Sequence, residues 1–169
     1  MEKKLNRRMA LFFGVLVMPW YFAYGRNVSI EKLIERIGRT PSLTCRAILP
    51  GYELRFNKVP GPKENAGYAN IIPAAEKWVE GLLYMLTEQD LARLDKHEGV
   101  PRHYRRGEVM VWNIEQGRWV NAITYIAVET DDSLKPPREY LMEIIGAAEI
   151  AGLSPEWISS LKELLKQAV

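Results

Sequence analysis

Apolar residues recur along this chain with two different spacings, and each spacing predicts one kind of secondary structure. Short apolar runs, alternating or continuous, predict strands, and the first of them ends at Gly25. The expected strands are residues 20–24, 43–49, 52–58, 68–72, 78–86, 104–114 and 119–128. Pro50 and Gly51 predict a turn between the second and third strands, and residues 115–117 predict a hairpin turn between the last two.

Helical spacing of apolar residues occurs in four places, each with a start or stop signal. Ser29 is the expected N-cap of a helix that Gly38 ends, and Thr87 predicts the start of a second helix. The last two helices are expected at residues 137–151 and from Pro155 onward. Strands with helices at the front, middle and end favour an α+β fold, with a mixed sheet or small barrel flanked by helices.

The first 17 residues differ in character from the rest of the chain. Residues 1–8 are basic and residues 9–17 are apolar, as in the first two regions of a signal peptide. The apolar run is too short to span a bilayer, and cleavage near Ala23 would remove the first predicted strand. We therefore expect residues 1–17 to be an N-terminal extension, with Met18 as the natural start and residues 18–169 as one domain.

Composition and charge fit a single packed domain. Of the 169 residues, 47% are hydrophobic, which is enough for a core and too many for a disordered chain. A formal net charge of +2 creates no strong field for nucleic acid or an acidic partner. Cys45 is the single cysteine, so an internal disulfide and a multi-cysteine metal site are excluded, and a buried thiol in a strand is expected. This cysteine usage is typical of a reducing cytosol, and we expect a cytoplasmic protein.

Several common kinds of site are not indicated. The spacing of His97 and His103 matches no standard zinc pattern. The basic run at residues 102–106 can contact a phosphate backbone, but we favour an edge strand with its charges in water. The five tryptophans are expected to anchor the core, and no glycine-rich phosphate loop or nucleophile-elbow serine occurs. We therefore expect no metal, nucleic-acid partner or stable membrane partner, and we leave a homodimer open.

Two short segments carry the candidate chemistry. The first strand breaks at Gly25, and the backbone N–H groups around this glycine turn can form a concave anion site. Glu98 is an isolated carboxylate beside Gly99, where a helical pattern stops; alone, it also fits a solvent-facing helix end. Apolar neighbours such as Leu94, Val100 and Tyr104 would raise the pKa of a catalytic glutamate. An anion site and one acid suit a reaction in which the substrate carries its own nucleophile and the enzyme only moves protons.

Three segments of the chain, in this order, resemble signature segments of the γ-glutamylcyclotransferase family. They are residues 21–27, residues 94–100 around Glu98, and residues 136–140 with the glycines that follow at 146 and 152. The resemblance implies a small β-barrel with helices around it. It also implies a cofactor-free acyl transfer, linked to glutathione metabolism, in which a γ-glutamyl amino acid or amine releases its amine and the glutamyl part cyclises to 5-oxoproline.

The resemblance also implies roles for particular residues. Glu98 is then the catalytic acid and base. The residues expected to line the substrate are Tyr21, Phe22, Ala23, Tyr24, Gly25, Arg26, Asn27 and Tyr140. Tyr104 and Tyr125 are weaker candidates, because tyrosines on strands are more often part of the core.

One position departs from the family pattern, which has serine where this chain has Arg26. An arginine can bind the α-carboxylate of the substrate, bind a second carboxylate, or fill the pocket. We therefore expect a γ-glutamylcyclotransferase-like enzyme and keep two alternatives. One is a γ-glutamylamine or peptide-tailoring cyclotransferase, and the other is a non-catalytic glutamyl-binding or interaction module on the same fold.

Overall fold

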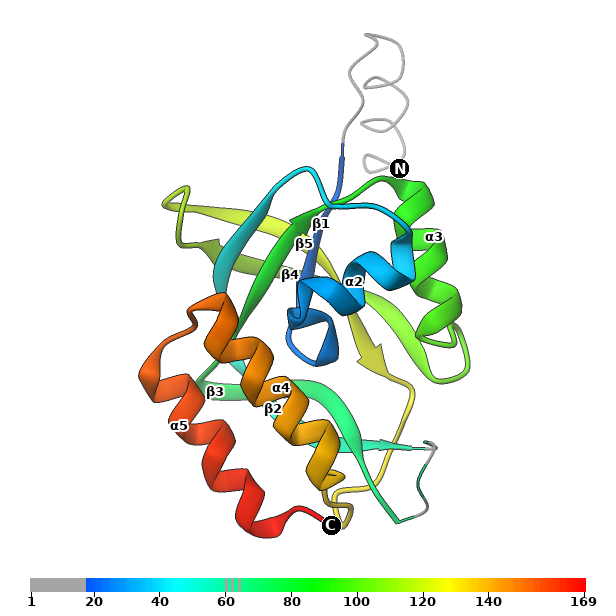
Figure 1. Ribbon diagram of the computed structural model, residues 1–169, viewed down its shortest axis with the longest axis vertical. Helices are drawn as coiled ribbons and strands as arrows, with labels where there is room; N and C mark the ends of the chain where they lie inside the picture. The colour runs from blue at the N-terminus through cyan, green and yellow to red at the C-terminus, as the bar shows by residue number, and fades with distance from the viewer. Residues whose placement is uncertain (1–17, 60, 62, 64) are drawn as a thin grey trace, which may run out of the picture.

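Five strands close into a mixed β-barrel in the computed structural model, which describes residues 18–59, 61, 63 and 65–169 (Figure 1). The barrel strands are β1 (Trp20–Ala23), β2 (Thr44–Val59), β3 (Tyr68–Met85), β4 (Tyr104–Asn113) and β5 (Arg118–Ala127). The short β6 (Glu129–Thr130) pairs with the end of β2 outside this ring. β1 runs antiparallel to β3 and parallel to β5. β2 pairs with β3 and β4, and β4 pairs with β5, which completes the ring. The expected α+β fold with a small mixed barrel is confirmed.

Four α-helices and two short 3-10 helices make up the rest of the described secondary structure. They are η1 (Arg26–Val28), α2 (Ile30–Ile37), α3 (Glu88–His97), α4 (Arg138–Ala151), α5 (Pro155–Leu164) and η2 (Leu165–Gln167). The predicted N-caps are confirmed, because Ser29 accepts from the Lys32 N–H and Thr87 shares a reciprocal capping box with Asp90. Gly38 ends α2 at a φ of 80°, in the left-handed region that glycine enters at little cost.

The sequence prediction of short strands on either side of Pro50 and Gly51 is wrong. β2 runs through both residues, and a register shift separates the pair Pro50–Trp78 from the pair Tyr52–Pro73. β3 likewise joins the two strands expected at residues 68–72 and 78–86. A proline and a glycine resemble a turn locally, but here they lie at an irregularity in the pairing of the two long strands.

The helices cover the barrel in two groups. α2 packs against α3, and α4 packs against α5 and η1. Figure 1 shows α4 and α5 side by side at the lower left and α2 with α3 at the upper right. The buried core is continuous through β1 and the inward faces of the helices, with Cys45 inside it as expected. The tryptophan prediction is only partly met, because Trp78 is 50% exposed and Trp119 is 54% exposed.

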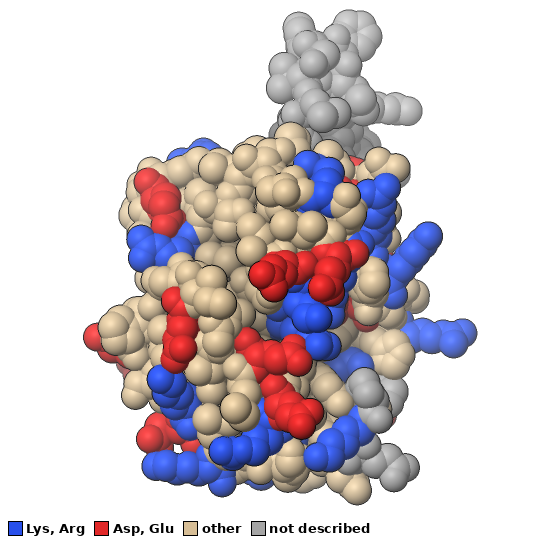
Figure 2. All heavy atoms as spheres, in the orientation of Figure 1, with Lys and Arg blue, Asp and Glu red and all other residues tan. Residues whose placement is uncertain are grey.

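The surface carries charges of both signs close together. Figure 2 shows acidic and basic side chains interspersed over the face that α4 and α2 form. In the run at residues 102–106, the expectation that all charges face water is wrong for Arg106, which pairs with Asp95 at 2.8 Å and Glu88 at 3.5 Å. None of the described helices is long and apolar enough to cross a membrane. The expectations for residues 1–17 lie outside the described part of the chain.

Candidate active site

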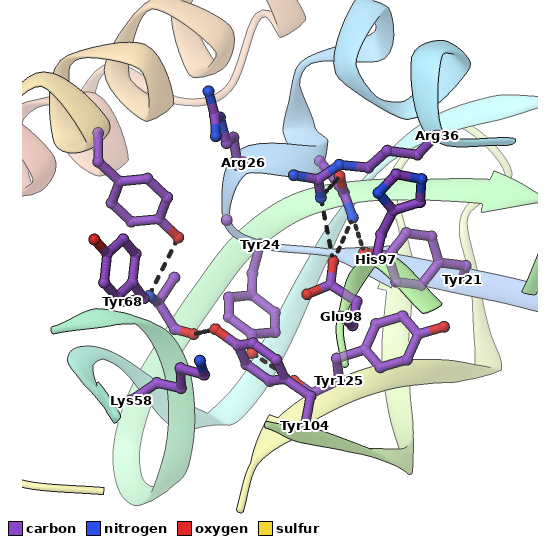
Figure 3. Close-up of a pocket in the computed structure, with 14 residues that line it drawn as sticks. Tyr21, Tyr24, Arg26, Arg36, Lys58, Tyr68, His97, Glu98, Tyr104 and Tyr125 are labelled. Atoms are coloured by element: carbon purple, nitrogen blue, oxygen red, sulfur yellow. Dashed lines mark hydrogen bonds and ion pairs between the residues drawn. The ribbon is translucent and has the colours of Figure 1, made fainter. Parts of the chain in front are cut away.

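The turn after β1, the end of α3 and a group of tyrosines converge on one cavity of about 220 Å³ (Figure 3). A cavity of this size suits a small molecule. Its lining residues are Tyr21, Tyr24, Gly25, Arg26, Asn27, Arg36, Lys58, Tyr68, Ala69, His97, Glu98, Tyr104, Tyr125 and Tyr140. The structure thus brings Glu98, the glycine turn and Tyr140 together, as the sequence predicts.

Glu98 reaches the cavity because α3 ends at this residue. The N–H of Glu98 donates to the Leu94 carbonyl at 2.8 Å, and Gly99 then turns the chain at a φ of 65°. The side chain of Glu98 is only 16% exposed. The alternative that Glu98 is a solvent-facing residue at a helix end is therefore wrong.

One oxygen of the Glu98 carboxylate is held by two donors. Glu98 Oε1 accepts from Asn27 Nδ2 at 3.1 Å and from an Arg36 guanidinium nitrogen at 3.3 Å. Asn27 is itself fixed, since its Nδ2 also donates to the Tyr21 hydroxyl at 2.8 Å and its Oδ1 accepts from Arg36 at 2.6 Å. Figure 3 shows the other Glu98 oxygen directed into the cavity. One oxygen is thus anchored while the other is placed to exchange a proton with a bound molecule.

The surroundings of Glu98 tune its acidity in the direction that proton transfer needs. Burial raises the pKa of Glu98 above its usual value, and the positive charge of Arg36, the hydrogen bond from Asn27 and the charge of Lys58 only partly offset this rise. The apolar wall consists mainly of tyrosine rings. Of the three expected wall residues Tyr104 lines the cavity, whereas Leu94 lies in the core and Val100 packs against it. The prediction that Leu94 and Val100 form this wall is therefore wrong.

The tyrosines of the cavity are held by hydrogen bonds. The Tyr104 hydroxyl donates to the Ala69 carbonyl at 2.7 Å, and the Ala69 N–H donates to the Tyr140 hydroxyl at 3.3 Å. The Tyr24 hydroxyl donates to the Tyr125 carbonyl, and the Tyr125 hydroxyl donates to Asp95 at 2.8 Å. Burial raises the pKa of all these phenols, so they remain neutral. Both weaker candidates, Tyr104 and Tyr125, are among the residues that line the cavity.

Gly25 is needed for close approach. A Cβ at this position would lie 3.1 Å from the Ala69 Cβ, which is tighter than most real Cβ contacts, and 3.7 Å from the Tyr140 hydroxyl, which is an ordinary contact. The φ of Gly25 is −109°, so a left-handed conformation is not the reason for glycine. η1 begins directly after it, and the first N–H groups of a helix have no intrahelical partner. The glycine turn therefore offers backbone donors beside Glu98.

Three predicted lining residues need correction or refinement. Phe22 and Ala23 do not line the cavity, since both side chains are buried in the core. Phe22 points to the opposite face of β1 from Tyr21, which lines the cavity, because successive residues of a strand alternate. Ala23 shares the face of Tyr21, but its short side chain is not among the lining residues. Arg26 lies at the rim, where its Nε donates to Glu143 at 2.7 Å. The suggestion that this arginine fills the pocket is therefore wrong.

Five lining residues were missed by sequence reasoning: Arg36, Lys58, Tyr68, Ala69 and His97. Arg36 belongs to the polar side of α2, and Lys58 lies one residue before the end of β2, so neither has a local signal of function. Their placement depends on pairing between distant strands. Among the described residues, no group of three or more histidines, cysteines or acidic residues could hold a metal ion.

Comparisons with known proteins place this geometry in context. The family model described as gamma-glutamyl cyclotransferase, AIG2-like, matches residues 21–142. The protein YkqA of Bacillus subtilis is 31% identical over 150 residues, and the match covers 85% of this chain and 50% of YkqA. The chain thus spans half the length of that relative. The gamma-glutamylcyclotransferase of Mus musculus is 29% identical over 153 residues, which cover 85% of this chain and 77% of the mouse protein.

Solved structures agree with the sequence matches. A gamma-glutamyl cyclotransferase has a TM-score of 0.76 at 25% identity, with 86% of this chain and 87% of that chain covered. The crystal structure of YkqA has the same TM-score of 0.76 at 27% identity, with 95% of this chain and 59% of that chain covered. Both solved structures are similar to this chain over most of its length.

Proposed function

The chain belongs to the gamma-glutamyl cyclotransferase, AIG2-like family, and from this premise we propose that it is a cyclotransferase acting on γ-glutamyl compounds. The reaction is an acyl transfer in which the α-amine of the substrate attacks its own γ-carbonyl. The products are 5-oxoproline and the free amine. The observation that carries this proposal is the position of Glu98, anchored by Asn27 beside the glycine turn inside a tyrosine-lined cavity.

Glu98 moves the proton in this mechanism. Its carboxylate takes a proton from the α-amine as the amine attacks, and it returns the proton to the nitrogen of the leaving group. A positioned acid–base residue contributes roughly 10²- to 10⁴-fold to a rate. The hydrogen bonds from Asn27 and Arg36 to one oxygen support this role, because they fix the direction of the other oxygen.

The cavity itself contributes by folding the substrate. Closing a five-membered ring requires no second reactant, and good orientation of two groups can supply up to roughly 7–11 kcal/mol of the barrier. We assign the glutamyl carboxylate or the developing oxyanion to the backbone N–H groups at Gly25, Arg26 and Asn27. The tyrosine rings restrict water, which would otherwise hydrolyse the same bond.

A product assay tests the proposal. Purified protein is incubated with a panel of γ-glutamyl dipeptides and γ-glutamyl amines, and 5-oxoproline is measured by mass spectrometry. Release of 5-oxoproline from amines alone would indicate a γ-glutamylamine or peptide-tailoring enzyme. Tight binding of a glutamyl ligand without turnover on any member of the panel would indicate a binding module and contradict the proposed activity.

The pH profile of kcat/KM should show the raised pKa of Glu98. The carboxylate must be ionised to accept a proton, so activity should fall about tenfold per pH unit below its pKa. Because burial raises this pKa, the acidic midpoint should lie above the value of about 4.3 for an ordinary glutamate. Initial rates from pH 3.5 to 8 measure it. A midpoint at or below the ordinary value would contradict the assignment.

Replacing Arg26 with serine should leave turnover within about threefold of the unchanged protein. The guanidinium pairs with Glu143 at the rim, with side chains 36% and 46% exposed, and exposed pairs contribute little to stability. Glu143→Gln is the matched control, since it breaks the same pair from the other side. A loss of more than about 100-fold in kcat/KM for Arg26→Ser alone would show that Arg26 binds the substrate directly.

A further inference from the structure

The carboxylate of Asp95 lies in the last turn of α3, three residues before Glu98, and it accepts hydrogen bonds from two strands of the barrel. Its Oδ1 accepts from Arg106 Nε at 2.9 Å, and its Oδ2 accepts from a terminal nitrogen of Arg106 at 2.8 Å. The Tyr125 hydroxyl also donates to Oδ1, at 2.8 Å. Of these three residues only Tyr125 lines the cavity. The proposed reaction therefore gives Asp95 and Arg106 no direct contact with a substrate.

The β4–β5 hairpin places the two partners of Asp95 side by side. Arg106 and Tyr125 are directly opposite each other in the antiparallel register, and opposed residues project from the same face of the sheet. Arg106 also reaches Glu88 at the start of α3, at a longer distance of 3.5 Å. The side chains of Asp95 and Arg106 are 26% and 29% exposed, so their bidentate pair is partly shielded from water. A geometry of this kind fixes a carboxylate more firmly than an exposed single contact does.

A Schellman motif joins the backbone of Asp95 to that of Glu98. The Val100 N–H donates to the Asp95 carbonyl at 2.9 Å, and the Gly99 N–H donates to the Lys96 carbonyl at 3.3 Å. Glu98 is the C-cap residue enclosed by these two bonds. Because the motif fixes the backbone from Asp95 to Val100, a movement of Asp95 relative to the barrel would move Glu98 with it.

The hydrogen bonds of Glu98 are sensitive to such a movement. Glu98 Oε1 lies 3.1 Å from Asn27 Nδ2 and 3.3 Å from an Arg36 nitrogen, near the upper end of the hydrogen-bond range. A displacement of about 0.5 Å would take both contacts out of that range. The link from Asp95 to the barrel therefore keeps the anchored oxygen of Glu98 in place.

The ring of Tyr125 extends the same constraint to the residue that anchors Glu98. It packs edge-on against the Tyr21 ring, with centroids 5.6 Å apart, and the Tyr21 hydroxyl accepts from Asn27 Nδ2 at 2.8 Å. Figure 3 shows the Tyr125 hydroxyl directed away from Glu98, in agreement with its bond to Asp95 outside the cavity lining. Asp95 thus holds both the helix end that carries Glu98 and the ring beside its anchor.

We propose that Asp95 is a positioning residue for the reaction, which acts through Arg106 and Tyr125 to fix the carboxylate of Glu98. This inference rests on the proposed cyclotransferase function, and it adds a pair of charged residues outside the cavity to the groups on which turnover depends. The cavity binds the substrate, whereas Asp95 and Arg106 determine whether Glu98 meets the α-amine in the right position. Their loss should therefore lower kcat more than it raises KM.

Replacing Asp95 with asparagine tests the assignment. Asparagine keeps the shape of the side chain but has one acceptor oxygen in place of two, so the guanidinium fork of Arg106 loses a partner. On the γ-glutamyl dipeptide that the unchanged protein turns over fastest, kcat for release of 5-oxoproline should fall by about 10- to 100-fold, because a misplacement of about 1 Å can cost 100-fold. KM should rise by less than about threefold, since no residue of the cavity lining is replaced.

The partner of Asp95 gives an independent test from another element. Arg106→Met should lower kcat by the same factor as Asp95→Asn, although neither residue lines the cavity. Arg106→Lys keeps a cation and one donor toward the carboxylate, so it should be at least about threefold faster than Arg106→Met. Recovery by the conservative variant would indicate that the pair itself, and not the size of the side chain, supports turnover.

A double variant distinguishes positioning from general damage to the fold. If Asp95 acts through Glu98, Asp95→Asn should lower kcat by less than about threefold when it is added to Glu98→Gln. A further loss of about tenfold or more in the double variant would show that Asp95 affects turnover independently of Glu98, and it would overturn the assignment.

The matched control is Asp90→Asn in the same helix. Asp90 also binds an arginine fork, that of Arg39, but it lies at the start of α3 and is absent from the cavity lining. Its side chain is 2% exposed and that of Asp95 is 26% exposed, so Asp90→Asn should lower the melting temperature at least as much as Asp95→Asn. Its kcat, measured below the unfolding transition, should stay within about threefold. An equal loss of kcat in the two variants would make loosening of α3 the cause and contradict the role of Asp95.

The remaining outcomes separate this inference from the function on which it rests. Unchanged kcat in Asp95→Asn or in Arg106→Met overturns the role of Asp95 and leaves the cyclotransferase activity standing. If one of these two variants does not fold, the other decides. A rise in KM at constant kcat overturns the role as well, because Asp95 would then support substrate binding. No 5-oxoproline from the unchanged protein would contradict the proposed function, and the positioning role would fall with it.

Discussion

Replacing Glu98 with glutamine is expected to lower kcat by about 10²- to 10⁴-fold with little effect on the fold. Glutamine has nearly the same shape and can still accept hydrogen bonds from Asn27 and Arg36 through its amide oxygen, but it cannot take a proton from the α-amine. Release of 5-oxoproline, measured under saturating substrate, reports the loss. Binding of the substrate, measured by calorimetry, should remain.

The control for this substitution is Glu149→Gln on α4. Glu149 is half exposed and pairs with Lys162 at 2.9 Å, so its replacement removes the same charge far from the cavity lining. Its kcat should stay within about twofold. Equal turnover by Glu98→Gln and Glu149→Gln would remove Glu98 from the mechanism.

Stability gives a second readout for Glu98. Because burial raises its pKa in the folded protein, ionisation of Glu98 disfavours folding once the pH exceeds the unfolded value of about 4.3. Glu98→Gln should therefore be at least as stable as the unchanged protein at pH 7. The difference should disappear below about pH 4, where the carboxyl is protonated in both states. Urea unfolding at the two pH values measures this.

Replacing Asp90 with alanine is expected to lower the free energy of unfolding by about 2–4 kcal/mol. Asp90 is 1% exposed, accepts from the Thr87 N–H at 2.9 Å and binds the Arg39 guanidinium through both oxygens. Alanine cannot form the capping box of α3, and it leaves the Arg39 guanidinium without its carboxylate partner. For a domain of this size the melting temperature should fall by roughly 5–15 °C.

The pH dependence of this loss has the opposite sign to that of Glu98. Burial alone would raise the pKa of Asp90, but hydrogen bonds from Arg39 and Thr87 outweigh it and lower the pKa. The stabilisation is therefore complete above the unfolded value of about 3.9 and is lost as the pH falls through the lower folded value. The control is Glu163→Ala, because Glu163 forms an exposed ion pair with Lys166. This substitution should change the free energy of unfolding by less than about 0.5 kcal/mol. A loss for Asp90→Ala no larger than this would contradict the role of the capping box.

The helices illustrate how far local sequence reaches. Ser29, Thr87 and Ser154 each cap a helix by accepting an N–H from three residues further on. Such contacts form within one turn, so neighbouring residues determine them before any tertiary contact exists. Gly38 and Gly152 end their helices for a similarly local reason, a left-handed conformation that glycine enters at little cost.

The lengths of the strands and the residues that line the cavity could not be predicted from neighbouring residues alone. Pro50 and Gly51 resemble a turn, yet β2 continues through them because β3 supplies a partner on both sides of the irregularity. Arg36 and Lys58 carry no motif, and they line the same cavity as Glu98 only because α2 and β2 return to the end of α3. The resemblance to a family located Glu98 and Tyr140, but it also placed Phe22 in the cavity, where strand alternation turns it into the core.

Short-range hydrogen bonding and apolar spacing were thus enough to define the helices, most strand positions and the α+β class. The environment of Glu98 required the closed barrel, because burial, the bond from Asn27 and the charge of Lys58 come from segments far apart along the chain. Acidity and substrate selection depend on distances between such segments. The order of residues along the chain does not give those distances, because they are set only when the strands pair and the barrel closes.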